Sequence, residues 1–147
     1  MAIRGTAKKA AALLAACVLA AATAACANAG ELVELTFSGG RAALELNESA
    51  SARDLLTMLP LTLTFEDYNS TEKIVYPPRK LATLGAPASC DPSKGDFALY
   101  APWGNLVIFY NDFTASPGLV PLGRVKSGLG KLAAMNGRFA ATLKAVK

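Results

Sequence analysis

Two stretches near residue 30 alternate between apolar and polar positions. Residues 31–37 carry an apolar side chain at every second position, and residues 41–46 repeat the pattern after Ser38-Gly39-Gly40. Alternation with a period of two is typical of a strand with one buried face. Two such runs on either side of a glycine pair predict a β-hairpin.

The pattern then changes to helical spacing for a short distance. Ser51 and Asp54 match a capping box of the form S-x-x-D, which predicts that a helix begins there. An apolar stripe follows at helical spacing, and Pro60 ends the helix because proline lacks the amide hydrogen that helix continuation needs. Residues 61–65 alternate Leu and Thr before Phe65, so they predict a strand with one solvated face.

Residues 66–96 are rich in Pro, Gly, Asn and Ser and predict mainly loops. Pro102-Trp103-Gly104-Asn105 predicts a tight turn between two later strands. Residues 136–137, Asn-Gly, give a second hairpin signal before the last strand. The remaining predicted elements are strands over 97–101, 106–110, 119–125 and 138–146 and a helical turn over 129–135. Seven or eight short strands with one helix favour a compact β-barrel or sandwich.

The first 29 residues have the organisation of an export signal. Three basic residues precede an uncharged, alanine-rich run over residues 10–25, and an A-x-A cleavage site ends at Ala29. The run is shorter than the roughly 20 residues that a membrane span needs. We therefore expect residues 1–29 to be a signal peptide for general secretion and residues 30–147 to be the mature domain, with a retained N-terminal anchor as the alternative.

A second cleavage position is open. Ala25 and Cys26 match the end of a bacterial lipoprotein signal, although Thr23 stands where leucine is usual. Lipidation of Cys26 would tether the domain to a membrane. The expected location is therefore periplasmic or extracellular, with a membrane-anchored lipoprotein as the variant.

The net charge of the predicted mature domain is lower than that of the full chain. The full chain has a net charge of +4, but three of its 15 basic residues and none of its 11 acidic ones lie in residues 1–29, so residues 30–147 carry +1. No basic run remains to follow a nucleic-acid backbone. The chain has no His, which excludes Ser-His-Asp triads, Cys-His dyads and HExxH zinc sites. Cys90 alone is left in the mature domain, and we expect no cofactor and no metal.

An ordered series of short motifs between residues 51 and 128 resembles a known family. The motifs are Arg53-Asp54-Leu55-Leu56, Leu59-Pro60-Leu61, Glu72-Lys73-Ile74, Pro78-Arg79-Lys80-Leu81, Gly95-Asp96, Tyr100-Ala101-Pro102-Trp103-Gly104-Asn105-Leu106, Ile108-Phe109-Tyr110, Gly118-Leu119 and Leu122-Gly123-Arg124-Val125. Together they resemble the bacterial cyclophilin-like domain family. The resemblance implies a closed barrel of eight strands with one or two helices, and it implies no settled activity. Cyclophilins that isomerise prolyl bonds use an Arg, a Gln and a His, whereas this chain has neither Gln nor His.

Aromatic residues gather in the middle of the sequence and suggest a ligand groove. Nine of the aromatic residues fall between positions 65 and 113. Trp103 is the strongest candidate because a tight turn does not need a large ring. Tyr100 and Tyr110 are expected near it. The alternative is that these rings only cover the two faces of barrel strands.

Two charged positions complete the predicted ligand site. Glu72 would lie at the rim of the groove, and Arg124 would hold an anionic group by a bidentate contact. The alternatives are a solvated loop around Glu72-Lys73 and a structural ion pair for Arg124.

The sequence as a whole predicts an exported, non-catalytic cyclophilin-like barrel. Its expected ligand is a small molecule or an extended peptide. The alternative activity is that of a divergent peptidyl-prolyl cis-trans isomerase acting on exported proteins. A third hypothesis is an assembly partner in the cell envelope, which lipidation of Cys26 would favour.

Overall fold

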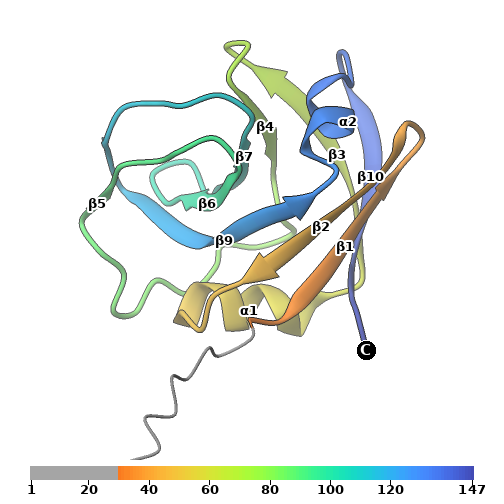
Figure 1. Ribbon diagram of the computed structural model, residues 1–147. Helices are drawn as coiled ribbons and strands as arrows, with labels where there is room; N and C mark the ends of the chain where they lie inside the picture. Colours follow the sequence, from red (N-terminus) through yellow and green to blue (C-terminus); the bar gives the residue numbers. More distant parts are fainter. Residues whose placement is uncertain (1–29) are drawn as a thin grey trace, which may run out of the picture.

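The computed structural model describes residues 30–147, which form one closed β-barrel (Figure 1). The predicted signal peptide over 1–29 and the lipidation position Cys26 lie outside the described residues. Eight antiparallel strands close the barrel, as the family resemblance implied. In order around the barrel they are β1 (Leu32–Phe37), β10 (Phe139–Ala145), β3 (Leu61–Tyr68), β4 (Glu72–Val75), β7 (Asn105–Phe109), β6 (Asp96–Tyr100), β9 (Leu119–Ser127) and β2 (Gly40–Leu46).

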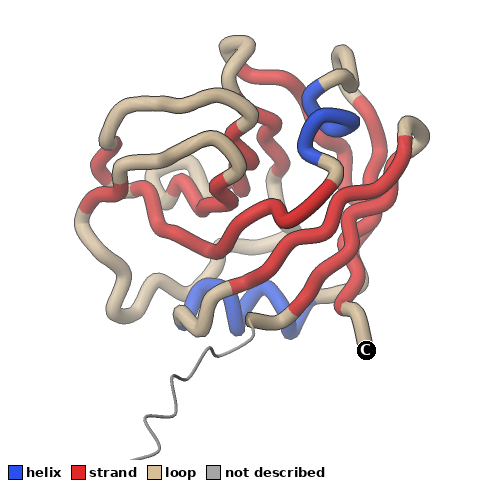
Figure 2. Tube along the Cα trace, viewed as in Figure 1, coloured by secondary structure: helices blue, strands red, loops and turns tan. Residues whose placement is uncertain are grey.

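The predicted N-terminal hairpin is confirmed. Strands β1 and β2 pair from Leu32 opposite Glu45 to Phe37 opposite Gly40. Strand β1 also pairs with β10, the last strand of the chain, so the two ends of the domain close the barrel side by side (Figure 2). Closure removes the exposed sheet edges that would otherwise invite pairing with other chains.

Two helices lie at opposite ends of the barrel, α1 (Ala50–Met58) and α2 (Leu129–Ala133) (Figure 1). Ala52 and Leu55 of α1 and Leu132 of α2 are fully buried against the barrel interior. Within residues 30–147, neither helix has the length and apolar character needed to cross a membrane.

The helix α1 begins two residues earlier than the capping box predicts. Ser49 is the N-cap, and its Oγ accepts a hydrogen bond from the amide of Ala52 at 3.1 Å. The side chain of Asn47 accepts from the Ser49 amide and fixes the approach to the helix. Ser51 is instead buried inside the helix and donates to the carbonyl of Ala82 at 2.5 Å. Ser49 caps the helix, and the hydroxyl of Ser51 bonds to a loop carbonyl instead.

The predicted hairpin at Asn136-Gly137 is also wrong. The segment before it is α2, and β10 pairs with β1 and β3 rather than with its predecessor in sequence. Asn-Gly makes a turn here, but the turn joins a helix to a strand. Local turn chemistry predicts a change of direction and does not select the partner strand.

The barrel wall separates two apolar clusters. The interior cluster includes Leu35, Leu44, Leu99 and Ile108, all 1% exposed or less. A smaller cluster lies on the outer face of β4, β7, β6 and β9 and consists of Ile74, Ala98, Val107, Phe109 and Leu119. The outer cluster is the part of the fold that positions the candidate site.

Loops cover this outer cluster on one side of the barrel. They carry a two-stranded sheet of β5 (Ser89–Cys90) and β8 (Ser116–Pro117), seen to the left of the barrel in Figure 1. The region predicted as loops thus contains β4 and β5, and β3 extends to Tyr68. The sequence missed β4 because it is four residues long and its second residue, Lys73, looks like a surface position.

Candidate functional site

A cavity of about 280 Å³ lies between the outer face of the barrel and these covering loops. Its wall combines aromatic rings with one carboxylate and one amide. The lining residues are Tyr68, Glu72, Tyr100, Trp103, Asn105, Val107, Phe109, Phe113, Ser116, Pro117 and Leu119. A concave apolar site with a few polar groups is the usual form of a small-ligand pocket.

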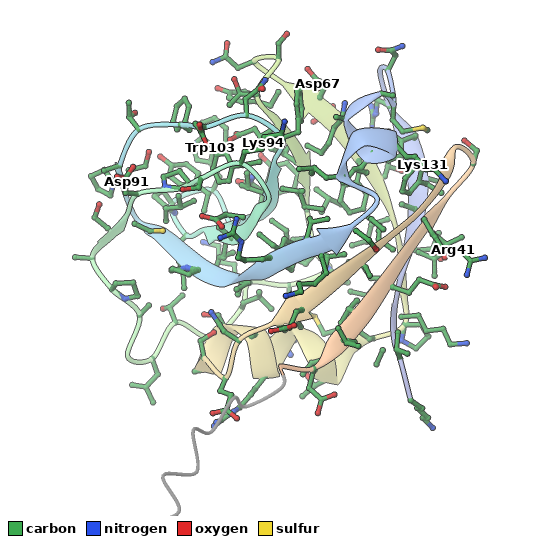
Figure 3. All side chains as sticks on the ribbon, in the orientation of Figure 1. Arg41, Asp67, Asp91, Lys94, Trp103 and Lys131 are labelled. Atoms are coloured by element: carbon green, nitrogen blue, oxygen red, sulfur yellow. The ribbon has the colours of Figure 1, made fainter. Side chains whose placement is uncertain are left out.

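The β6–β7 turn positions Trp103 and Tyr100. The amides of Trp103 and Gly104 both donate to the carbonyl of Tyr100, and Gly104 adopts a φ of 76° that favours glycine. This turn confirms the prediction for residues 102–105. Trp103 is 49% exposed, on the side of the barrel away from the β1–β2 hairpin (Figure 3).

Gly118 holds the same turn against the chain before β9. Its carbonyl accepts from the amide of Ala101 at 2.9 Å. A Cβ at Gly118 would lie 2.7 Å from Cδ of Pro102, and the residue has a φ of 79°. Only glycine permits this close approach without a shift of the turn, so Gly118 fixes where Trp103 stands.

Trp103 is the central ring of three. Its ring meets that of Tyr100 at a centroid distance of 5.3 Å and an interplanar angle of 78°. It meets Tyr68 at 5.8 Å and 86°. Tyr68 was not predicted as a site residue because it lies beyond the recognised strand. Continued alternation from residue 61 would have placed it on an outward face.

Glu72 is the ionisable carboxylate of the cavity. In β4 it lies opposite Tyr68 of β3 on one side and opposite Phe109 of β7 on the other. Burial raises the pKa of Glu72 above its usual value of 4.5. No described residue forms a hydrogen bond or ion pair with its carboxylate. The solvated-loop interpretation of Glu72-Lys73 is therefore wrong, because both residues belong to a strand with buried neighbours.

Asn105 is buried behind the wall and has an acceptor without a partner. Its side chain is fully buried on the same face of β7 as Val107 and Phe109. Its Nδ2 lies 3.4 Å from the carbonyl of Leu106, and its Oδ1 has no hydrogen-bond partner within residues 30–147. An amide oxygen buried without a partner costs free energy that a donor would recover.

The rest of the lining is apolar. The rings of Phe109 and Phe113 stack at a centroid distance of 6.1 Å, and Val107 and Leu119 lie beside them. The cavity thus combines one carboxylate with aromatic and hydrocarbon side chains.

Tyr110 lies outside this cavity, which corrects its predicted place beside Trp103. It follows β7 on the interior side, and its hydroxyl donates to Asp67 at 2.6 Å. Burial and the bond to Asp67 raise the pKa of Tyr110 to about 12. The alternation of β7 sends Tyr110 to the face opposite Phe109.

Asp67 and Tyr110 enclose a buried lysine near α2. Lys73 is 1% exposed, and its Nζ donates to Asp67 at 2.8 Å and to the carbonyl of Met135 at 2.6 Å. The ammonium also lies 5.0 Å from the centre of the Tyr110 ring. Burial disfavours the Asp67 carboxylate, but the bonds from Lys73 and Tyr110 outweigh it and lower the pKa of Asp67. These satisfied groups form a structural cluster.

Arg124 also lies outside the cavity. Its Nε is 3.4 Å from Asp96, and its guanidinium donates to the carbonyl of Lys94 at 3.2 Å. The structural ion pair, the alternative for this residue, is what the structure contains. The cavity therefore brings together Trp103, Tyr100 and Glu72 of the predicted site residues and leaves out Tyr110 and Arg124.

Metal-binding and nucleophilic groups do not gather in the described part of the chain. There, no three His, Cys, Asp or Glu side chains come close enough to hold a metal ion. Cys90 is half-buried beside the outer cluster, and burial with Asp96 and Asp91 nearby raises the pKa of its thiol. A raised pKa keeps the thiol protonated and unreactive.

The closed barrel of eight antiparallel strands with two short helices defines the class as a mainly β, closed-barrel protein. The cyclophilin-like family matches residues 35–144, and the chain belongs to that family. No curated protein matches the chain.

A solved structure has the same fold. The solution structure of the hypothetical protein AF2241 from Archaeoglobus fulgidus matches with a TM-score of 0.63 at 14% identity. The match covers 80% of this chain and 96% of that one. This similarity concerns the fold alone.

Proposed function

We propose that this protein is an exported binding module that holds a small molecule or an extended peptide in the Trp103 cavity without transforming it. One observation carries the proposal: five aromatic rings line a cavity of about 280 Å³, and three of them, Trp103, Tyr68 and Phe113, are more than 40% exposed. Large rings kept partly in water beside a cavity are typical of ligand contact surfaces.

The chemistry of the lining supports binding over covalent catalysis. The candidate nucleophile of the wall, Ser116, donates its hydroxyl to the carbonyl of Thr114 rather than to a base. Nucleophilic catalysis needs a base within hydrogen-bond reach of the attacking group. The wall has the groups to orient a ligand and no described pair that would activate one.

Prolyl isomerisation is the second candidate, since it needs only a pocket for a twisted amide. The hydrocarbon wall of Phe109, Phe113 and Leu119 has the apolar character that a proline ring requires. A proline-peptide isomerisation assay separates the two functions. The binding-module proposal expects a rate equal to that in buffer, and an acceleration that Phe113→Ala abolishes would establish the isomerase.

The cavity is tested with a fragment and proline-peptide library on residues 30–147, which contain the whole barrel. Trp103 is the single tryptophan of the chain, so its fluorescence reports the cavity directly. We expect amide shifts to concentrate on Tyr68, Glu72, Tyr100 and Trp103. Shifts spread evenly, or none, would contradict the proposal.

Trp103→Ala is the matching variant. It removes the central ring from an exposed turn, so we expect about 1 kcal/mol or less of lost stability and at least a tenfold loss of ligand affinity. Arg124→Ala is the control, because this exposed side chain lies outside the cavity. Equal affinity of Trp103→Ala and the unchanged protein would place the ligand elsewhere.

Export is a separate part of the proposal and has its own test. The intact mass of the protein secreted from a bacterial host distinguishes a chain beginning at Gly30 from one lipidated at Cys26. A lipidated chain would favour the envelope-partner hypothesis. A mass that retains residues 1–29 would contradict export with cleavage.

A further inference from the structure

We infer that the Trp103 cavity selects an organic cation, namely an alkyl- or arylalkyl-ammonium group with N–H donors. The inference rests on the proposed binding function and names the ligand class. Its elements are the unpaired carboxylate of Glu72, the rings of Tyr68, Tyr100 and Trp103, and the hydrocarbon part of the wall.

The charge of the wall is unbalanced. Glu72 is half-buried, its carboxylate has no hydrogen bond or ion pair within the described chain, and the lining contains no Lys or Arg. Desolvation of an unpaired carboxylate is costly, as the raised pKa of Glu72 reflects. A cation bound beside it offsets that cost, whereas an anion would add to it.

The rings provide a second attraction for a cation. Trp103 stands nearly perpendicular to both Tyr68 and Tyr100, so the ring planes meet the cavity from different directions. The face of an aromatic ring carries partial negative charge, and tryptophan binds cations most strongly. Rings in several planes beside a carboxylate are suited to surround one positive group.

The unpaired carboxylate of the wall specifies donors on that positive group. Glu72 is the acceptor in the wall that lacks a partner among residues 30–147, whereas Oδ1 of Asn105 is buried behind the wall and is not accessible from the cavity. A primary ammonium supplies three donors, whereas a quaternary ammonium supplies none. We therefore assign the site to a protonated amine rather than to a choline-like group.

The apolar part of the wall determines the polarity and the size of the rest of the ligand. Val107, Phe109 and Leu119 belong to the buried outer cluster, and Phe113 stacks on Phe109. A cavity of about 280 Å³ is at the lower end of the range for small-ligand pockets. It suits a hydrocarbon chain the size of a lysine side chain, which a free amine or a peptide lysine would both present.

Lys80, which packs beside the β6–β7 turn, does not fill this place. The stem of Lys80 packs near Gly104, where a Cβ would lie 3.4 Å from its Cγ. Lys80 is exposed and is not part of the lining. The cation of the cavity is thus expected from outside.

The test uses four probes on residues 30–147: n-butylammonium, its neutral counterpart 1-butanol, N-acetyl-lysine methylamide, and the same compound acetylated on Nε. Trp103 fluorescence and amide shifts give the affinities at neutral pH. We expect the charged probes to bind at least tenfold tighter than their neutral counterparts. The tighter of the two charged probes identifies a free amine or a peptide lysine as the source.

Glu72→Gln is the decisive variant, and Glu66→Gln is its matched control. Each variant replaces one carboxylate by an amide, and the two positions lie in the adjacent strands β3 and β4. Glu72 lines the cavity, whereas Glu66 does not. Glu72→Gln removes the negative charge and its charge-assisted hydrogen bonds, so it should weaken binding of the charged probes by roughly 10- to 100-fold. Glu66→Gln should change their affinity less than twofold, and amide spectra verify that both variants fold.

The outcomes separate this inference from the proposed function. Equal binding of charged and neutral probes, with no effect of Glu72→Gln, overturns the cation inference and leaves a neutral binding module. Failure of the charged probes while library fragments shift Tyr100 and Trp103 has the same meaning. Failure of all probes and fragments overturns both.

Discussion

Glu72 and Lys73 are neighbours in β4 and face opposite sides of the barrel wall. Lys73 is fully buried with Asp67 and the carbonyl of Met135 as partners. Glu72 is half-buried toward the cavity with no partner in the described chain. A buried charge with its partners in place is a structural group, and an unpaired charge in a cavity is a candidate for function. The period of two in a strand produces both outcomes from adjacent residues.

Glu72→Gln is expected to stabilise the unliganded protein at neutral pH. The pKa of Glu72 is raised in the folded state, so folding disfavours the ionised carboxylate. Its penalty is present above the folded-state pKa and disappears as the pH falls through that pKa toward 4.5. The variant should therefore have the higher thermal midpoint at pH 7, with the difference vanishing near pH 4.

Thermal unfolding of both proteins between pH 4 and pH 7 checks this expectation. Glu66→Gln is again the control. A lower midpoint for Glu72→Gln at pH 7 would mean that the carboxylate has a structural partner, which would remove the basis of the cation inference.

The Asp67–Lys73–Tyr110 cluster shows how one residue can join several elements. Asp67 lies near the end of β3, and Lys73 lies in β4. Tyr110 directly follows β7, and Met135 lies two residues after α2. Hydrogen bonds of 2.6–2.8 Å connect all four. The cluster fixes the chain after α2 over the barrel. Lys73 itself does not line the cavity.

The two partners of this ion pair should respond unequally to mutation. Asp67→Ala leaves the Lys73 ammonium buried without its counter-charge, which costs about 3–5 kcal/mol. Lys73→Met removes the buried charge and leaves Asp67, whose side chain is 31% exposed, to be solvated. We expect Lys73→Met to cost about 1–2 kcal/mol.

Urea unfolding at pH 7 measures the free energy of unfolding of both variants. Tyr110→Phe is a milder change in the same cluster. Equal losses for Asp67→Ala and Lys73→Met would contradict the assignment of the buried charge to Lys73. Neither variant should alter ligand affinity by more than about twofold, since the residues face away from the cavity.

The helix α1 is tied to the long segment after β4 by a second charged contact. Arg79 donates to both oxygens of Asp54 at 2.7 and 2.8 Å, and the amide of Ala82 donates to the same carboxylate. The hydrogen bonds from Arg79 and Ala82 lower the pKa of Asp54 to about 2. This contact holds a stretch that contains neither helix nor strand between residues 76 and 88.

Asp54→Asn is expected to loosen this stretch. Because the folded-state pKa is depressed, the contribution of Asp54 is fully present above pH 3.8 and is lost as the pH falls to about 2. Hydrogen exchange at the amide of Ala82 should accelerate in the variant at pH 7. The unchanged protein should show the same acceleration only under strong acid, and unaltered protection in the variant would contradict the assignment.

At the scale of the whole molecule, the local pattern predicted the elements better than their partners. Alternation predicted β1, β2 and the first part of β3, because each places an apolar side chain toward the interior at every second position. It missed β4, whose buried Lys73 resembles a surface residue until Asp67 and Met135 are brought to it by the closed barrel. The pairing of β10 with β1 and β3 depends on closure, which no single segment encodes.

For the candidate site too, the sequence predicted the contacts within one segment but not those between strands. Trp103 and Tyr100 belong to one turn, so their proximity follows from the turn itself. Tyr68 and Glu72 reach them through the register of β3, β4 and β7, which requires the assembled sheet. Tyr110 was misplaced because it was grouped by composition, while strand alternation sends its ring to the other side of the wall.

The candidate ligand site thus lies outside the barrel core, where Trp103 of the β6–β7 turn and Glu72 of β4 line one cavity. The most direct test is the titration of residues 30–147 with n-butylammonium and 1-butanol, read by amide shifts. We predict that n-butylammonium shifts Glu72, Tyr68, Tyr100 and Trp103 together, at least tenfold tighter than 1-butanol. Shifts that avoid these residues, or equal affinities for the two probes, would contradict a cation site at this cavity.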